Sequence, residues 1–389
     1  MHVVGFVSEL NPFHNGHAYF TEQLRHAGDT YVVTVMSGNF VQRGEAAFTD
    51  KYLRAEAAVR SGVDLVLELP VPWALGGAES FARGGVSLLK SFGCDALAFG
   101  CETDDTALLQ HTADCMHRSD IQITVAQKRK SGSSYPAAVA QTLREAGEAD
   151  AARVLETPNN VLAVEYIKAL QALHGNLSLL PVRRAGAGHD GQMTGGNIQS
   201  ASCLRSLPDL QAMRPFLPAS AFNVFNTHPD RLLDRQSFET VVLTTLRLLP
   251  EEAFERFVTD RSGLVDRLRK AVRQAVTLSQ LYDLAKTKNV THAKVRREVM
   301  RLFLQIPPVF ETQTPPFARV LAANRRGLAV LSGEACMIPV ITKHAETARL
   351  DAFAQSLYAL QCRASDLYAL CTKEKRACCS EQQSSILII

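Results

Sequence analysis

The stretch VVGFVSELNPFHNGHAYF, residues 3–20, decides the fold. It begins as an apolar, β-branched run that is typical of a buried strand, and Pro12 then fixes a turn after it. Gly16 lets the backbone pass close to a ligand, and His14 and His17 are spaced to fall on one face of a helix that begins here. Both imidazoles should therefore point at whatever binds the N-terminus of that helix.

The start of a helix attracts anions, because its first N–H groups are free and its dipole is positive at that end. A nucleotide phosphate is therefore the expected ligand of this turn. His14 and His17 can donate hydrogen bonds to the negative charge that builds up when phosphorus is attacked, and we predict that both are catalytic. The alternatives are two structural histidines beside a tight turn, and a zinc site, for which the stretch supplies no third ligand.

Four more short apolar runs follow the first one, and helix-like patterns separate them. This repeat predicts an α/β fold, with a Rossmann-type parallel sheet and helices on both faces. Ligands of such sheets bind at the carboxyl ends of the strands, where each informative stretch of the first half lies. The five runs are HVVGFV at 2–7, TYVVTVM at 30–36, VDLVLEL at 63–69, DALAFG at 95–100 and LSLLPV at 177–182.

The pattern changes at about residue 207 to amphipathic segments with few strand signals. We therefore expect two domains: 1–206, which holds the sheet and the nucleotide, and 207–389, which is mainly helical and ends in a small C-terminal segment. Proline-rich stretches at 208–218 and 305–324 are the expected connections. The end of the chain, CCSEQQSSILII, suggests no role.

The composition is that of a globular protein with a nearly balanced charge. The 389 residues carry a net charge of +3, so any surface for nucleic acid must be a local patch. No apolar window approaches the roughly 18 residues of a membrane span and no signal peptide is evident, so we expect a cytoplasmic protein without membrane contact. The nine cysteines are expected to be reduced thiols, and the irregular gaps between Cys362, Cys371 and Cys378 do not predict a metal site.

The histidine turn resembles the H-x-G-H signature of the nucleotidyltransferase superfamily, whose members attack the α-phosphate of ATP. Four further stretches, in the same order, are similar to the bacterial tRNA(Met) cytidine acetate ligase family. The resemblance implies a nucleotidyltransferase-like fold, ATP-dependent activation of acetate to acetyl-adenylate, and acetylation of the wobble cytidine of elongator tRNA(Met). The four stretches are MSGNFVQRGEAAFTDKYLRAE at 36–56, GVDLVLELP at 62–70, PNNVLAVEYIKAL at 158–170 and IQSASCLR at 198–205.

The expected ATP site combines the histidine turn with later stretches. Arg183 and Arg184 precede a glycine-rich loop and a serine-rich helix start, where arginines can bind phosphate oxygens and hydroxyls can close over them. By resemblance, 158–170 would contact ATP and 198–205 would close on pyrophosphate. Mg²⁺ should accompany ATP, because acidic ligands are sparse in these motifs. The predicted ATP-binding residues are Val7, Ser8, Glu9, Leu10, Asn11, Pro12, Phe13, His14, Asn15, Gly16, His17, Phe20, Gly100, Asn159, Asn160, Arg183, Arg184, Ser200, Ser202 and Arg205.

A second set of residues is predicted to bind RNA. Six basic residues gather between 286 and 301 with one acidic residue among them, and 127–136 forms another basic loop. Clustered cations supply the phosphate contacts that dominate RNA affinity, and a solvated helix face is the alternative interpretation. Lys51 and Arg54 share one helix face and are included for the same reason. The predicted RNA-binding residues are Gln42, Arg43, Lys51, Arg54, Lys128, Arg129, Lys286, Lys288, Lys294, Arg296 and Arg297.

Two other functions fit parts of the sequence. An adenylyltransferase acting on a small phosphorylated metabolite would use the same first half, but it would leave the basic helix unexplained. An RNA-binding protein with a degenerate nucleotide pocket would have no need of intact His14 and His17. No protein partner is implied.

Overall fold

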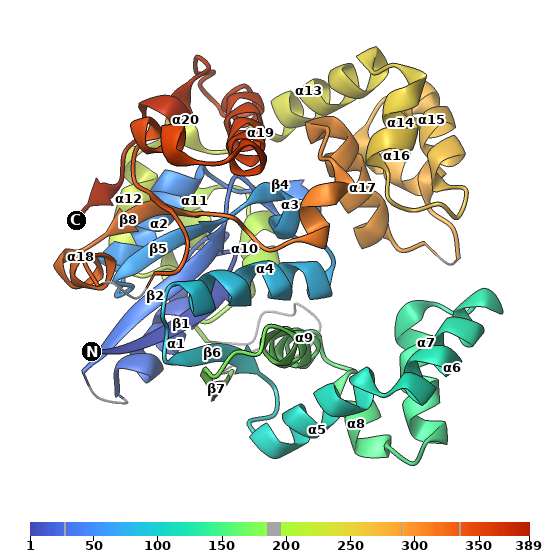
Figure 1. Ribbon diagram of the computed structural model, residues 1–389. Coiled ribbons are helices and arrows are strands. Elements are labelled where there is room, and N and C mark those ends of the chain that lie inside the picture. The colour runs from blue at the N-terminus through green and yellow to red at the C-terminus, as the bar shows by residue number, and fades with distance from the viewer. Residues whose placement is uncertain (27–28, 185–195, 289, 334–335) are drawn as a thin grey trace.

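The computed structural model describes residues 1–26, 29–184, 196–288, 290–333 and 336–389, with a mostly parallel sheet at its centre (Figure 1). The strand order is β10-β8-β5-β2-β1-β6-β7, with β9 beside β8. All five predicted strands are confirmed, and they pair in parallel. They are β1 (His2–Ser8), β2 (Thr30–Ser37), β5 (Leu65–Leu69), β6 (Ala96–Cys101) and β7 (Ser178–Arg183).

Helices cover both faces of the sheet. Successive residues of a strand point to opposite faces, so neighbouring residues contribute to two different cores. Val3 and Val33 belong to one core, with residues of α4 and α9, whereas Val4 and Val32 belong to the other, with residues of α1, α2 and α12. The expected α/β class is thus confirmed. The helices are α1 (Asn15–His26), α2 (Lys51–Arg60), α4 (Ala78–Ser91), α9 (Pro158–Ala172) and α12 (Ala219–Thr227).

The last segment of the chain does not follow the expected division into two domains at residue 206. β8 (Ala318–Ala323) lies antiparallel beside β5, and β10 (Leu387–Ile388) lies parallel beside β8. The second half therefore completes the sheet of the first half, and 207–389 is not a separate helical unit. Every residue of β8 is buried, so the strand shows no polar alternation that would reveal it, and it follows a proline-rich stretch.

A helical lobe, made of α13 to α17, lies beside the sheet at the upper right of Figure 1. It contacts the hairpin formed by β3 (Phe40–Val41) and β4 (Glu45–Ala46). Gly44 of this hairpin has φ +74°, and a Cβ there would lie 2.6 Å from backbone atoms of Arg296 and Arg297, so α17 packs directly on it. The lobe consists of α13 (Arg235–Leu248), α14 (Glu251–Phe257), α15 (Leu264–Gln274), α16 (Leu278–Ala285) and α17 (His292–Leu304).

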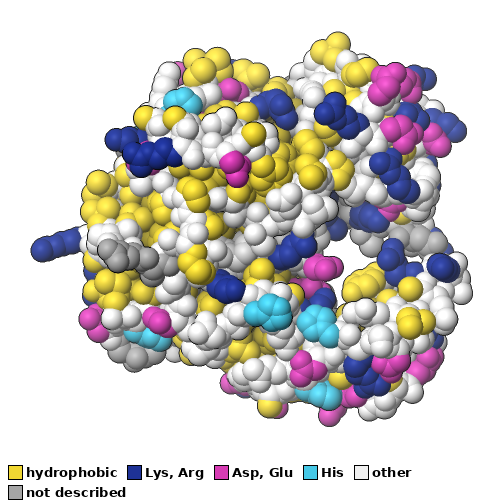
Figure 2. Space-filling model, in the orientation of Figure 1, with side chains coloured by type: hydrophobic (Ala, Val, Ile, Leu, Met, Phe, Trp, Pro, Cys, Tyr) yellow, Lys and Arg dark blue, Asp and Glu magenta, His cyan; other side chains and the backbone are white. Residues whose placement is uncertain are grey.

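A smaller lobe is inserted between β6 and α9, at the lower right of Figure 1. The face shown in Figure 2 is hollowed between the two lobes, and Lys and Arg side chains lie around the hollow. In the described residues, no helix has the length and apolar character that crossing a membrane requires. The small lobe consists of α5 (Thr106–His117), α6 (Ser119–Lys130), α7 (Tyr135–Glu145) and α8 (Ala149–Val154).

Short elements complete the chain around the sheet. Among them, α19 and α20 lie above the sheet in Figure 1. The remaining elements are α3 (Val71–Ala74), α10 (Ala201–Ser206), α11 (Leu210–Met213), α18 (Arg325–Leu331), β9 (Val340–Ile341), α19 (Ala352–Ala369), α20 (Ser380–Gln383) and the 3₁₀ turns Arg214–Phe216, Pro229–Arg231, Pro308–Thr312 and His344–Arg349.

A buried ionic cluster, made of Lys51, Glu68, Arg319 and Glu381, joins the end of the chain to its first half. Lys51 Nζ lies 2.6 Å from a Glu68 oxygen and 2.5 Å from a Glu381 oxygen, and Arg319 Nε lies 3.2 Å from Glu381. No member exposes more than 3% of its side chain, so two cations and two carboxylates balance one another inside the protein. The end of the chain, to which the sequence suggested no role, therefore supplies one of the four charges through Glu381.

Lys51 and Arg54 are not available to RNA, so the prediction is wrong for both. Arg54 is fully buried, and its guanidinium donates hydrogen bonds to the main-chain oxygens of Thr49, Glu9 and Ser37. Both side chains do lie on one face of α2, as the spacing predicted, but that face packs against the protein interior.

Candidate functional site

A cavity of about 620 Å³ opens at the carboxyl ends of β1, β6 and β7. This is the edge of a parallel sheet where ligands are expected. Sixteen of the predicted ATP-binding residues line it: Val7, Ser8, Glu9, Leu10, Asn11, His14, Gly16, His17, Phe20, Gly100, Asn159, Arg183, Arg184, Ser200, Ser202 and Arg205.

Pro12, Phe13, Asn15 and Asn160, the other predicted ATP-binding residues, are not among the residues that line the cavity. Phe13 is fully buried in a core. Asn15 instead donates through Nδ2 to the main-chain oxygens of residues 197 and 215, at 2.8 and 3.2 Å. Asn160 Oδ1 accepts from the main-chain N–H groups of residues 102 and 103, at 2.9 and 3.2 Å. The two asparagines therefore hold the loops that shape the cavity.

His14 and His17 lie side by side at the start of α1. Their rings stack with centroids 3.8 Å apart and an angle of 28° between the planes. The N–H of Gly16 donates to His14 Nδ1 at 3.0 Å, and the N–H of His14 faces His17 Nδ1 at 3.3 Å. Each Nδ1 is thus an acceptor, and a neutral imidazole of this kind carries its proton on Nε2.

Both imidazoles stay neutral in the folded protein. Burial, together with the nearby cations Arg184 and Arg205, lowers the pKa of His14 to about 3. Burial also holds the pKa of His17 well below its usual range, together with its neighbour His14 and with Arg184. A ligand in the cavity therefore meets two Nε2–H donors that need no proton from solvent.

The arginines of the cavity are held by neutral groups or by none in the described residues. Arg205 donates to the main-chain oxygen of Asn11 at 2.7 Å, and Arg184 donates to Asn159 Oδ1 at 2.8 Å. Within the described ranges, the side chains of Arg43 and Arg183 have no hydrogen bond or ion pair, and both residues are exposed at the cavity. Cations without carboxylate partners suit a polyanionic ligand such as a triphosphate.

Asn11 holds a buried donor beside the cavity. Its side chain is 1% exposed, and its Oδ1 accepts from the main-chain N–H of Phe48 at 2.7 Å. Its Nδ2 has no partner among the described residues, although the residue lines the cavity. A buried amide group without a partner is costly unless a ligand or water accepts from it.

Aromatic residues that the sequence did not single out form part of the cavity wall: Tyr19, Phe81, Phe99 and Tyr166. Phe99 lies in a predicted strand and Tyr166 in a predicted helix, where an aromatic residue is ordinarily part of the core. No local pattern distinguishes a core aromatic residue from one that faces a cavity. Such a wall suits the flat face of a nucleotide base.

The structure separates the predicted RNA-binding residues into several groups. Gln42, Arg43 and Arg297 line the same cavity as the histidines. Lys294 pairs with Asp260, and Arg296 pairs with Glu45 at 2.8 Å. The others lie apart from the cavity: Lys286 and Lys288 are exposed beside α16, while Lys128 and Arg129 lie on α6 of the small lobe.

The family model for the HIGH nucleotidyl transferases matches residues 1–383. A tRNA(Met) cytidine acetate ligase of Acetivibrio thermocellus is 30% identical over 96% of this chain and 96% of its own. The protein of the same name from Syntrophotalea carbinolica is 35% identical over 85% of this chain and 82% of its own.

Two crystal structures of Thermotoga maritima TmcAL share the fold. The apo form has a TM-score of 0.92 and the form bound with alpha-thio ATP has one of 0.90; each is 28% identical and covers 100% of both chains. The predicted nucleotidyltransferase-like fold is thus confirmed. The chain belongs to the HIGH nucleotidyl transferases and, among them, to the tRNA(Met) cytidine acetate ligase family.

Proposed function

We propose that the protein activates acetate with ATP and transfers the acetyl group to the wobble cytidine of elongator tRNA(Met). One observation carries the proposal: the stacked, neutral His14 and His17 lie in one cavity with arginines that make no ion pair with a carboxylate in the described residues. Family membership supports the same reading, because the relatives bear the name tRNA(Met) cytidine acetate ligase.

The first step is attack of an acetate oxygen on the α-phosphorus of ATP, with pyrophosphate as the leaving group. The Nε2–H groups of His14 and His17 donate to an oxygen of the α-phosphate, where negative charge grows in the transition state. The product is acetyl-adenylate.

The β- and γ-phosphates bind to the cationic part of the cavity. Arg183 and Arg205 supply guanidinium groups, and Ser200 and Ser202 supply hydroxyls from the segment that begins α10. Glu9 is the one acidic side chain among the described lining residues, and burial raises its pKa. Mg²⁺ would therefore be held mainly by phosphate oxygens and water, and it would neutralise charge on the leaving pyrophosphate.

In the second step the exocyclic amine of cytidine attacks the acetyl carbonyl carbon. AMP leaves with the oxygen that came from acetate, and the nitrogen gives up a proton. The cytidine must therefore enter the cavity, which Arg297 of the helical lobe helps to line. This guanidinium has no hydrogen bond or ion pair within the described residues, although Lys294, Arg296 and Arg301 of the same helix all pair with carboxylates. We assign Arg297 to a backbone phosphate beside the target cytidine.

The function is tested by incubating the purified protein with ATP, labelled acetate and total tRNA, followed by nucleoside analysis. Labelled acetylcytidine, formed together with AMP and pyrophosphate and without another cofactor, is the expected result. Label that stays in free acetate while ATP is intact would contradict the proposal.

The competing activity is an adenylyltransferase that joins AMP to a small phosphorylated metabolite. Exchange of labelled pyrophosphate into ATP separates the two, because the ligase requires acetate for exchange and the adenylyltransferase does not. Since its proposed substrate is tRNA, we place the ligase in the cytoplasm.

A further inference from the structure

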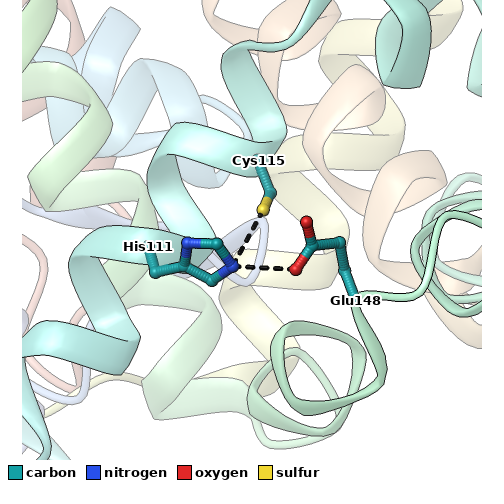
Figure 3. A group of neighbouring side chains, drawn as sticks. All are labelled: His111, Cys115 and Glu148. Atoms are coloured by element: carbon teal, nitrogen blue, oxygen red, sulfur yellow. Dashed lines mark hydrogen bonds and ion pairs between the residues drawn. The ribbon is translucent and has the colours of Figure 1, made fainter.

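Three potential metal ligands meet in the small lobe, away from the residues that line the ATP cavity. They are His111 and Cys115 of α5 and Glu148 at the start of α8 (Figure 3). Their ligand atoms all lie within 4.8 Å of one another. His111 and Cys115 are four residues apart, so they share a face of α5, and Gly147, with φ +82°, makes the turn that brings Glu148 to them.

Both partners of His111 converge on one nitrogen. His111 Nε2 lies 2.8 Å from Glu148 Oε2 and 3.5 Å from Cys115 Sγ, as the two dashed lines in Figure 3 show. A catalytic Cys-His-Glu relay would use the two ring nitrogens separately, one for the thiol and one for the carboxylate. The observed convergence therefore does not fit a relay.

The separation of His111 Nε2 from Cys115 Sγ fits a shared cation, whereas that of His111 Nε2 from Glu148 Oε2 is a hydrogen-bond distance, so the carboxylate would move back slightly to bind the ion. With zinc bonds of about 2.0 Å to nitrogen and about 2.3 Å to sulfur, a near-tetrahedral angle places the two ligand atoms about 3.5 Å apart. His111 Nε2 and Cys115 Sγ are 3.5 Å apart. Imidazole, thiolate and carboxylate together are a ligand set of zinc, and a cysteine ligand disfavours magnesium or calcium.

We propose that His111, Cys115 and Glu148 bind one zinc ion, with water in the fourth position. One thiolate and one carboxylate balance the two charges of the ion. Cys115 is 2% exposed, and its thiol must give up its proton to solvent as the Zn–S bond forms. The ion would join α5 to the start of α8 within the small lobe.

Arg118 is the group that competes with this assignment. It donates to the other oxygen of Glu148 at 2.9 Å and also pairs with Asp120 at 2.8 Å. Asp120 neutralises its charge, and the Glu148 oxygen that faces His111 is not the one that accepts from it. Arg118 thus orients the carboxylate from outside, as partners of zinc ligands commonly do.

The test is metal uptake by the full-length protein, without ATP or tRNA. The protein is freed of metal with a chelator, titrated with Zn²⁺ and, separately, with Co²⁺, and its metal content is measured after dialysis. One zinc per chain is expected, with release of one proton per zinc by calorimetry in buffers of different ionisation enthalpy. Cobalt should give the absorption of a thiolate-to-metal charge transfer.

Matched variants decide whether the metal lies here. Cys115→Ser should abolish the charge-transfer absorption, and His111→Ala and Glu148→Gln should each weaken zinc binding at least about tenfold. His117→Ala, an exposed histidine of the same helix, should bind as the unchanged chain does. Uptake far below one zinc per chain by the unchanged protein, or uptake that survives Cys115→Ser undiminished, would overturn the proposal.

Discussion

Basic side chains have different roles in two regions of this molecule. In the cavity that we propose binds ATP, the side chains of Arg43 and Arg183 are exposed and make no ion pair with a carboxylate in the described residues. In the buried ionic cluster, Lys51 and Arg319 each contact Glu381 and are almost fully buried. A cation that already has a carboxylate partner stabilises the fold, whereas a cation without one is available to an anionic ligand. The partner, rather than the residue type, decides the role.

The largest expected difference between the two regions is in stability. Lys51→Met leaves the buried Glu68 and Glu381 with one cation fewer, and breaking such a buried pair costs about 3–5 kcal/mol. Arg43→Gln, which removes an exposed cation, should change the free energy of unfolding by less than about 0.5 kcal/mol. Urea unfolding measures both. If the two variants had equal free energies of unfolding, the buried and the exposed cation would not differ in their contribution to stability.

The cavity should show its largest effect in catalysis. Replacing His14 or His17 by alanine removes a proposed donor to the α-phosphate, and we expect acetate-dependent exchange of pyrophosphate into ATP to fall about 10²–10³-fold. His117→Ala is the control, because this histidine is exposed on α5 and lies outside the cavity lining. Circular dichroism must show that the variants are folded. Full exchange by a folded His17→Ala variant would refute the assigned role.

The pH dependence of stability distinguishes the regions next. The folded-state pKa of His14 is lowered from 6.5 to about 3, and that of His17 is also lowered, so the unfolded chain binds more protons than the folded chain below pH 6.5. Stability from these neutral imidazoles is complete above pH 6.5 and is lost as pH falls, by up to about 1.4 kcal/mol per pH unit for each.

Within the buried ionic cluster, burial raises the pKa of Glu68 from 4.5, whereas Glu381 responds at lower pH. The pKa of Glu381 is lowered from 4.5 by Lys51 and Arg319 against the effect of burial, so its contribution is lost only as pH falls through that lowered value. Between pH 6.5 and 4.5, unfolding of the double variant His14→Asn, His17→Asn should therefore depend less on pH than that of the unchanged chain. Identical slopes would show that the imidazoles are not held neutral.

The smallest effect should come from Arg297, which lines the cavity and is proposed to contact RNA. Arg297→Gln should reduce tRNA acetylation about tenfold, leave pyrophosphate exchange unchanged, and lower the slope of log K for tRNA against log salt by about one. Arg296→Gln is the matched control, since Arg296 already pairs with Glu45. If exchange fell together with acetylation in Arg297→Gln, the guanidinium would belong to ATP and not to RNA.

Local pattern was enough to predict the five parallel strands and the histidine turn, because each signal lies in a few neighbouring residues. It failed for β8, whose six residues are all buried and show no alternation. It failed for Lys51 as well, because the carboxylates that hold this side chain lie at residues 68 and 381, which are distant in the sequence. Tyr166 was missed for the same reason, since only the assembled fold turns it toward the cavity.

The central claim is that an acetate oxygen attacks the α-phosphorus of ATP beside His14 and His17. Acetate labelled with ¹⁸O tests it directly, through the mass of the AMP formed while tRNA is acetylated. Attack at the α-phosphorus predicts AMP that carries one acetate oxygen in its phosphate. Unlabelled AMP, recovered while acetylcytidine accumulates, would contradict it.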